Sequence, residues 1–246
     1  MSGHSKWATI KHKKGAADAK RGQMFTKLIK EISIAARMGG GDPDTNARLR
    51  TSILKARAAN MPKDNIDRAI KKGTGELEGV NYEELVYEAY APGGVALLIE
   101  VLTDNKNRAA ADVRNMLTRS GGSLATSGAV SRLFKRKGVI TFDAEKYTED
   151  QIMEAALEGG AEDVADNDGV IEVTTTPEDF ESVLNALNAK SFESMSAEIS
   201  MIPEAEVALD KDAAAKALKL VEKLEENDDV QNVYHNVEVP EDYEAE

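Results

Sequence analysis

The first 14 residues of the chain combine lysine side chains with the rings of Trp7 and His12, a mixture that suits the binding of a nucleic acid. Lysines displace counterions from phosphate groups, and aromatic rings stack on unpaired bases. Trp7 is the only tryptophan of the chain and its segment offers it no apolar partner, so a merely solvated basic tail is the weaker explanation. The candidate binding residues continue into the next helix and are Lys6, Trp7, Lys11, His12, Lys13, Lys14, Lys20, Arg21, Lys27 and Lys30.

Charge is divided unevenly along the sequence. The first 72 residues hold 17 Lys and Arg but 6 Asp and Glu, a charge of +11, although the whole chain of 246 residues carries −13. The remaining residues therefore sum to −24. Because one end attracts polyanions and the rest repels them, we expect a basic end that faces DNA or ribosomal RNA and an acidic body that faces away.

Catalytic and metal chemistry finds little support in the sequence. The absence of cysteine excludes disulfides, thiolate metal sites and cysteine nucleophiles. The histidines His4, His12 and His235 lack the HExxH spacing of a zinc site. The acidic run 222–229 lies at a helix end beside solvent, without the partly dry setting that separates the pKa values of paired catalytic carboxylates. We expect no catalytic residue, no metal and no cofactor. An enzyme with an unrecognised site is the last alternative.

Two loops imitate ligand-binding motifs without completing them. The glycine-rich segment 120–128 contains neither GxxxxGK[ST] nor a GxGxxG that opens a helix, so nucleotide binding is disfavoured there. Residues 166–169 resemble the middle of an EF-hand loop, but Val164 and Thr175 stand where the first and last calcium ligands belong. We predict a hairpin turn at 167–169 instead.

Two further basic clusters lie in the body of the chain. Lys106, Arg108 and Arg114 occupy the start and one side of a predicted helix, where they can hold a phosphate near the helix N-terminus. The run Lys135–Lys137 interrupts an otherwise apolar segment, and we predict that it forms a solvated hairpin turn between two strands.

Apolar spacing predicts three helices before residue 75. From Met24 onward, apolar residues recur at i, i+3, i+4 and i+7, the pattern of an amphipathic helix, and Gly39–Gly41 ends it. Asp42-Pro43 then begins a second helix and Pro62 a third. A basic stripe falls opposite the apolar face of the first helix and consists of Lys20, Lys27, Lys30 and Arg37.

Strand patterns dominate after residue 80. Residues 85–91 and 95–103 predict a β-hairpin whose second strand is almost wholly apolar and therefore central in a sheet, and Asp104 or Asn105 can cap the helix that follows. The later elements are too many for one sheet, so we expect an α+β fold of three domains, with one ferredoxin-like α/β domain inserted in another. The expected domains are a basic tail with a three-helix domain (1–75), a split α/β domain (80–133 and 206–246) and an inserted α/β domain (134–205).

The chain offers no segment suited to a membrane. No apolar stretch approaches the roughly 18 to 20 residues of a spanning helix, and the N-terminus lacks the apolar core of a signal peptide. We therefore expect a cytoplasmic protein without a membrane partner, whose oligomeric state the sequence does not define.

Several segments resemble the YebC family, and together they cover most of the chain. They are GHSKWATIKHKKGAADAKRGQMFTKL, GGDPDTNARLR, ANMPKDNIDRAIKKGTG, YEAYAPGGVALLIEVLTDNKNRA and SGGSLATSGAVSRLF. The resemblance implies an all-α N-terminal domain and two α/β domains. It also implies a further basic surface, formed by Asn60, Lys63, Arg68, Lys71 and Lys72. For these residues, physical reasoning alone predicts only helix caps and a solvated helix.

The resemblance also bears on function. Members of the family are described as DNA-binding transcriptional regulators, mitochondrial members as translational activators, and bacterial members have been linked to ribosomes stalled on proline-rich sequence. Together with the charge pattern, this implies a non-enzymatic nucleic-acid-binding regulator of gene expression. We expect a DNA-binding transcriptional regulator, and the alternative is a translation factor that binds RNA or the ribosome.

Overall fold

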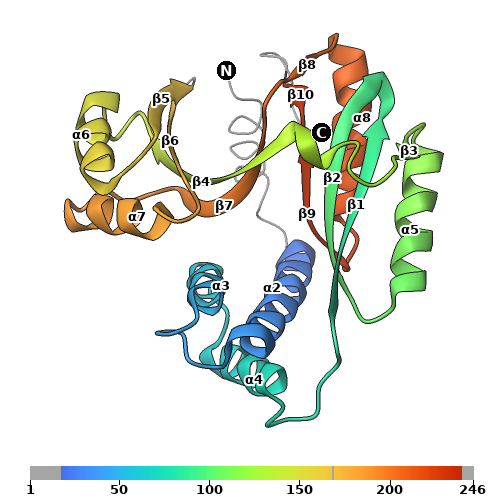
Figure 1. Cartoon of the computed structure of the whole chain (residues 1–246), viewed down its shortest axis with the longest axis horizontal. Helices are drawn as coiled ribbons and strands as arrows, with labels where there is room; N and C mark the ends of the chain where they lie inside the picture. The colour runs from blue at the N-terminus through green and yellow to red at the C-terminus, as the bar shows by residue number, and fades with distance from the viewer. Residues whose placement is uncertain (1–17, 168, 240–246) are drawn as a thin grey trace.

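The computed structural model describes residues 18–167 and 169–239, with side chains from residue 21 onward. Three helices lie below two antiparallel sheets that stand side by side, each with helices on its outer face (Figure 1). The α-helices are α2 (Asp18–Gly39), α3 (Ala47–Ala58), α4 (Lys63–Thr74), α5 (Lys106–Arg119), α6 (Glu149–Gly159), α7 (Phe180–Ala189) and α8 (Lys211–Glu225). The strands are β1 (Glu83–Ala91), β2 (Val95–Thr103), β3 (Ser123–Leu124), β4 (Phe134–Asp143), β5 (Asp163–Asn167), β6 (Val170–Thr175), β7 (Ser196–Pro203), β8 (Val207–Ala208), β9 (Val230–His235) and β10 (Val237–Glu238).

The helical domain packs α2 against α3 and α4 around buried apolar residues such as Ile32, Leu49 and Ile66. The predicted start of the second helix at Asp42-Pro43 is wrong, because these residues form a turn and α3 begins only at Ala47. Asn46 is the actual cap: its Oδ1 accepts the N–H of Leu49 at 3.0 Å, and its Nδ2 donates to the carbonyl of Ala35 at 2.8 Å. The cap therefore also ties α3 to α2.

The first sheet has the strand order β3-β1-β2-β9, and α5 and α8 cover one of its faces. The predicted hairpin is present, since β1 and β2 pair antiparallel from Glu83–Thr103 to Ala91–Val95. β2 lies between β1 and β9 and is buried along nearly its whole length, which explains its continuous apolar sequence.

The second sheet has the strand order β5-β6-β4-β7, with α6 and α7 on one face. The hairpin predicted at 167–169 connects β5 to β6, which pair antiparallel up to Asn167–Val170. The turn predicted at Lys135–Lys137 is wrong, because these residues lie inside the continuous strand β4 and pair with 200–202 of β7. At 135–137 the strand β4 pairs with β7 alone, because its pairing with β6 begins at Gly138, and Lys135 and Lys137 form ion pairs with Glu204 and Glu162.

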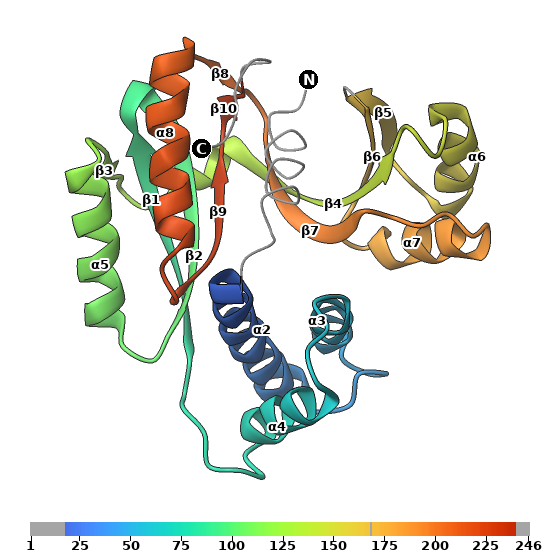
Figure 2. The same cartoon turned by 180° about the vertical axis from the view of Figure 1, so that it is seen from behind.

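The chain leaves the first sheet after β3, builds the second sheet, and returns to pair β9 with β2 (Figure 2). From this chain path we propose the domain boundaries that the sequence predicts. In this division, residues 134–205 form an α/β domain that is inserted between residues 80–133 and 206–246 of the split domain. None of the helices in the described ranges is long and apolar enough to cross a bilayer.

Candidate nucleic-acid interface

The described chain starts where the helical domain meets the first sheet. The first turns of α2 touch the end of α8: Gln23 donates to the carbonyl of Glu226, and Lys27 Nζ donates to the carbonyl of Glu225 at 2.5 Å. Arg21 is exposed on the first turn of α2. The other predicted binding residues of the tail lie outside the described residues, or their side chains do, namely Lys6, Trp7, Lys11, His12, Lys13, Lys14 and Lys20.

The prediction that Lys30 lies on a solvated basic stripe is wrong. Its side chain is only 9% exposed, and Nζ lies 2.7 Å from Asp229 Oδ1 and 2.9 Å from the carbonyl oxygen of Asp228. The same ammonium stands 5.6 Å from the centre of the Tyr82 ring. Helical periodicity correctly separates Lys30 from the apolar face of α2, but a second domain covers that other face, so Lys30 is not available to a phosphate.

Arg37 of the stripe is also used between domains. Arg37 donates to the carbonyl of Tyr82, and its other amino group lies 3.4 Å from Asn81 Oδ1. With Lys27, these contacts make the described part of the stripe a surface that docks α2 on the first sheet and the end of α8. Sequence reasoning missed this role because it requires the acceptors at 225–229, almost 200 residues away along the chain.

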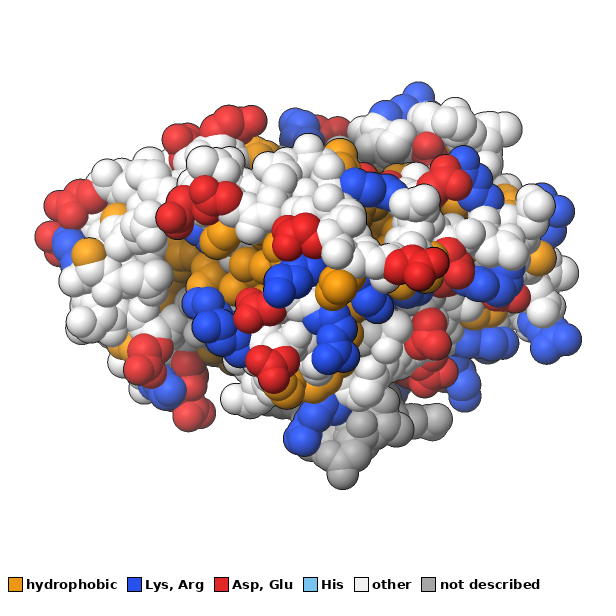
Figure 3. Space-filling view, turned by 90° about the horizontal axis from the view of Figure 1, so that it is seen from below, with side chains coloured by type: hydrophobic (Ala, Val, Ile, Leu, Met, Phe, Trp, Pro, Cys, Tyr) orange, Lys and Arg blue, Asp and Glu red, His pale blue; other side chains and the backbone are white. Residues whose placement is uncertain are grey.

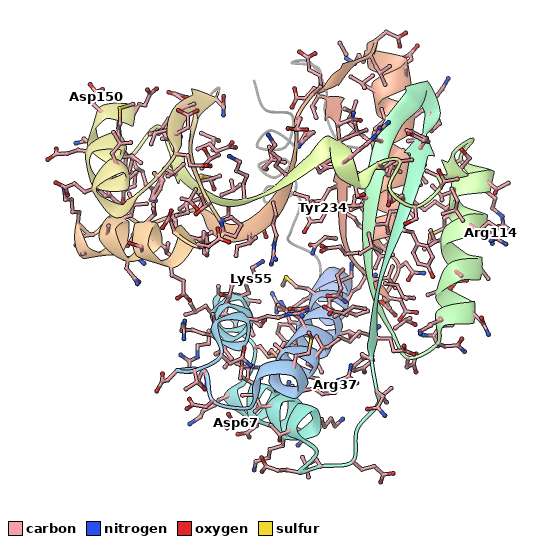
Figure 4. The ribbon with its side chains drawn as sticks, in the orientation of Figure 1. Arg37, Lys55, Asp67, Arg114, Asp150 and Tyr234 are labelled. Atoms are coloured by element: carbon pink, nitrogen blue, oxygen red, sulfur yellow. The ribbon has the colours of Figure 1, made fainter. Side chains whose placement is uncertain are left out.

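Basic residues of α3 attach the helical domain to the second sheet. Arg50 forms a forked ion pair with Glu181 of α7, with Nη2 at 2.8 Å from each carboxylate oxygen. Lys55 points from α3 toward the second sheet and pairs with Glu198 of β7 at 3.0 Å (Figure 4). The helical domain thus bridges both sheets with cationic side chains.

The phosphate site considered at the start of α5 is occupied by the protein's own acids. Asn105 caps α5, accepting the N–H of Arg108 at 3.0 Å, as the sequence predicts. Lys106 pairs with Glu83 at 2.5 Å, and Arg108 pairs with Asp104 at 2.6 Å and Asp229 at 2.8 Å. Two of the three cations proposed for this site are therefore committed within the fold.

The glycine-rich loop is held by a buried carboxylate. Glu88 Oε1 accepts the N–H of Gly128 at 2.7 Å, and Oε2 accepts the N–H groups of Val130 at 2.5 Å and Ser131 at 2.9 Å. Burial alone would raise the pKa of Glu88, but these backbone hydrogen bonds lower it below its usual value. Because the amides already hold an anion, they are not free to cradle a phosphate.

A group of exposed cations remains at the end of α3 and along α4. We call it the α3–α4 basic surface, and its members make no ion pair with the side chains that the structure describes. It contains Arg57, Lys63, Arg68, Lys71 and Lys72. Asp64 and Asp67 lie on the same helix, and basic and acidic side chains are interspersed on this side of the molecule (Figure 3). The family resemblance indicated all of these residues except Arg57, together with Asn60, and no other prediction indicated them.

The described residues contain one carboxylate with strongly altered acidity. Glu172 on β6 is 6% exposed, and its Oε2 has no hydrogen-bond partner in the described chain. Burial, followed by the charges of Asp163 and Glu206, raises the pKa of Glu172 to about 7. No group of three or more His, Asp or Glu side chains in the described ranges is arranged to hold a metal ion.

The surface depression at the start of α8 does not supply a catalytic pair either. It has a volume of 540 Å³ and is lined by Pro92, Asp210, Lys211 and Lys216 among others. Asp210 is engaged as the helix cap, with Oδ1 accepting the N–H of Ala213 at 2.8 Å.

Relatives with the same architecture are known. A probable transcriptional regulatory protein of Treponema denticola is 71% identical over 99% of both chains, and one of Borreliella burgdorferi is 60% identical over 98% of this chain and 99% of its own. The crystal structure of a conserved hypothetical protein of Aquifex aeolicus superimposes with a TM-score of 0.85 at 47% identity, covering 93% of this chain and 95% of that one.

Family models match both parts of the molecule. The TACO1/YebC N-terminal domain matches residues 5–76, and the TACO1/YebC second and third domain matches residues 82–237. The names of the bacterial relatives point to regulation and not to catalysis. Both matches together span nearly the whole sequence, so the chain belongs to the TACO1/YebC family.

Proposed function

We propose that this protein is a non-enzymatic, nucleic-acid-binding regulator of gene expression that acts on DNA as a transcriptional regulator. Its contact sites would be the basic segment 1–20 and the α3–α4 basic surface. The observation that carries the proposal is selective pairing: α2 and α3 use most of their cations to hold the other domains, whereas the α3–α4 basic surface pairs with none of the described residues.

The connection between α3 and α4 supports a duplex target. Four residues, 59–62, join the two helices, and Asn60 adopts a left-handed φ of 59° in this turn. Helix pairs joined by such short turns place their second helix in the major groove in many DNA-binding proteins. The cations on α4 and at the end of α3 would contact phosphates beside that groove. We propose a cytoplasmic location, which the absence of cysteine favours.

The second candidate is a translation factor that binds RNA or the ribosome. Trp7 and His12 favour it, because aromatic rings among lysines suit unpaired bases better than a closed duplex. The same basic residues would serve both functions, so the partner and not the surface distinguishes them.

The proposal is tested by removing each contact site from the full chain. Deletion of residues 2–17 leaves α2 intact and should abolish detectable binding to a labelled duplex at physiological salt. The variant Arg68→Gln/Lys71→Gln/Lys72→Gln should bind more weakly and lower the slope of log affinity against log salt by about 3, since each duplex phosphate contributes about 0.9. Lys146→Gln/Lys219→Gln/Lys223→Gln, with the same charge change on the acidic body, is the matched control. Unchanged affinity in both test variants would overturn the proposal.

The partner is identified by sedimenting cell lysate through a gradient with and without ribonuclease. A DNA-binding regulator should stay out of the ribosomal fractions and retain duplex binding in both samples. Migration with ribosomes that ribonuclease abolishes would instead select the translation factor.

A further inference from the structure

α6 and α7 leave one face of the second sheet uncovered, and the described helix that reaches this face is α3, whose Lys55 pairs with Glu198. Residues on the strands of this sheet alternate: Ile140, Val173 and Ala197 point into the core beneath α6 and α7, and their neighbours point to the other side. The hydrogen bond of 2.7 Å between the hydroxyl oxygens of Thr141 and Ser196 confirms that these two residues share that side. We call this side the open face, and it carries Val139, Thr141, Asp163, Glu172, Ser196 and Glu198.

The centre of the open face is buried and acidic, and the cations at its edge already have acidic partners, Lys55 with Glu198 and Lys137 with Glu162. Glu172 lies opposite Thr141 in the register, and Asp163 and Glu206 are close enough to act on its charge. Val139 and Thr141 are buried beside it although α6 and α7 lie on the opposite side of the sheet. A carboxylate oxygen that is buried, lacks a hydrogen-bond donor and faces two further acids is satisfied best by a cationic group.

The chain itself carries a segment of the required chemistry. Residues 1–17 contain four lysines, Lys6, Lys11, Lys13 and Lys14, and no aspartate or glutamate. This segment joins the fold at Asp18, where α2 begins at the junction of the domains. Seventeen extended residues reach at most about 60 Å, which is ample for a segment anchored between the two sheets.

We propose that the basic segment 1–17 docks on the open face of the second sheet around Glu172, and that a nucleic acid must displace it. The proposal rests on the proposed function, because it assigns the same lysines to both contacts. The acidic face then acts as an internal competitor for the nucleic acid. Since the segment is tethered, its local concentration reaches the millimolar range and even a weak contact is populated.

Trp7 makes the docking directly observable. It is the only tryptophan of the chain, so its fluorescence reports on the basic segment without any labelling. In the full-length protein we expect partial protection of Trp7 from acrylamide, a neutral quencher whose access does not depend on local charge. Glu172→Gln and Asp163→Asn should raise the quenching constant about twofold, as loss of a tethered contact shifts the population toward the undocked state.

The matched control is Asp150→Asn, which removes the same charge from an exposed position of α6 that points away from the domain junction (Figure 4). It should leave the quenching of Trp7 unchanged. Equal quenching in wild type, Glu172→Gln and Asp163→Asn would overturn the docking. Protection that grows with protein concentration would also overturn it, because the occupant would then belong to a second copy of the chain.

Binding to a nucleic acid separates this proposal from the proposed function. If docking competes, Asp163→Asn should bind a labelled duplex about threefold more tightly than wild type, and Asp150→Asn should not. If deletion of residues 2–17 leaves duplex binding intact, the proposed function of the segment fails, whereas the acrylamide result still decides whether it docks. If acrylamide quenches Trp7 more strongly in Asp163→Asn but this variant binds the duplex no more tightly than wild type, the docking stands and its competition with nucleic acid is refuted.

Discussion

The carboxylate of Asp229 collects cations from two domains. Lys30 of α2 lies 2.7 Å from one oxygen, and Arg108 of α5 lies 2.8 Å from the other, which also accepts the hydroxyl of Thr103 at 3.0 Å. Burial alone would raise the pKa of Asp229, but the hydrogen bonds from Lys30 and Arg108 lower it below its usual value. Asp229 therefore stays charged and holds the helical domain on the first sheet.

Removing Lys30 should weaken the fold more than removing any exposed lysine. Lys30→Met leaves a buried acid with one cation in place of two, and we expect unfolding free energy to fall by about 3 kcal/mol. Lys71→Met, at an exposed position of α4, should change it by less than about 0.5 kcal/mol. Urea denaturation of both variants measures the difference, and equal midpoints would contradict a structural role for Lys30.

Glu172 should make stability depend on pH. The native pKa of about 7 exceeds the usual 4.5, so between these values the folded state keeps a proton that the unfolded state has released. Stability therefore falls as pH rises through this window and stays low above it. Glu172→Gln should be more stable than wild type at pH 8 by up to about 3 kcal/mol, and equally stable at pH 4. Thermal unfolding at both pH values is the measurement, and an equal gain at both would refute the shifted acidity.

At the scale of elements, a single side chain organises the loop between β3 and β4. Glu88 holds three backbone N–H groups of residues 128–131, and Val130 and Phe134 then pack on the first sheet beside Leu98. Glu88→Ala should expose these amides and lower unfolding free energy by about 2 to 3 kcal/mol. Hydrogen exchange of residues 126–133 should accelerate, whereas the exposed control Glu178→Ala should leave it unchanged. Unaltered exchange in Glu88→Ala would show that the loop holds its shape without the carboxylate.

Sequence patterns predicted these elements where the cause is local. Asn105 is a cap because its neighbours start a helix, and β2 is central because its own residues are apolar. Sequence patterns gave wrong predictions where the residues that determine the structure are far apart in the sequence. Asn46 caps α3 while bonding to α2, and Lys135–Lys137 extends a strand because β7 lies alongside.

The candidate site shows the same limit. Charge spacing placed Lys27 and Lys30 on the polar arc of α2, which is correct for the isolated helix. Their acceptors are the carbonyls and the carboxylate at 225–229, so no local window of sequence contains the information that these cations are used internally. For the basic residues on α4, the structure supplied the opposite information, that they form no ion pair with a described residue.

At the scale of the whole molecule, the helical domain joins the two sheets through contacts of unequal strength. The contact with the first sheet includes the buried Lys30–Asp229 pair, whereas Arg50–Glu181 and Lys55–Glu198 on the second sheet are partly exposed. Exposed pairs contribute about 1 kcal/mol or less each. The second sheet, together with α6 and α7, is therefore the part whose position is held most weakly against the helical domain.

This difference predicts how the domains separate. Arg50→Ala/Lys55→Ala should leave the urea midpoint nearly unchanged but increase the radius of gyration in solution scattering, because the inserted domain can move away from α3. High salt should have the same effect on wild type by screening the two pairs. Arg57→Ala/Lys63→Ala removes two unpaired cations and serves as the control. An unchanged radius in the Arg50→Ala/Lys55→Ala variant would show that other contacts fix the inserted domain.

The return of β9 to the first sheet imposes an order on assembly during synthesis. The second sheet is complete once residue 203 has emerged, but the apolar edge of β2 has no partner until residues 230–235 follow. Asp229, the ion-pair partner of Lys30, directly precedes β9 and is therefore synthesised equally late. While more than a hundred further residues are synthesised, the nascent chain must therefore carry a hydrophobic strand with one unpaired edge and an undocked basic helix, a period in which chaperone binding would protect it from aggregation.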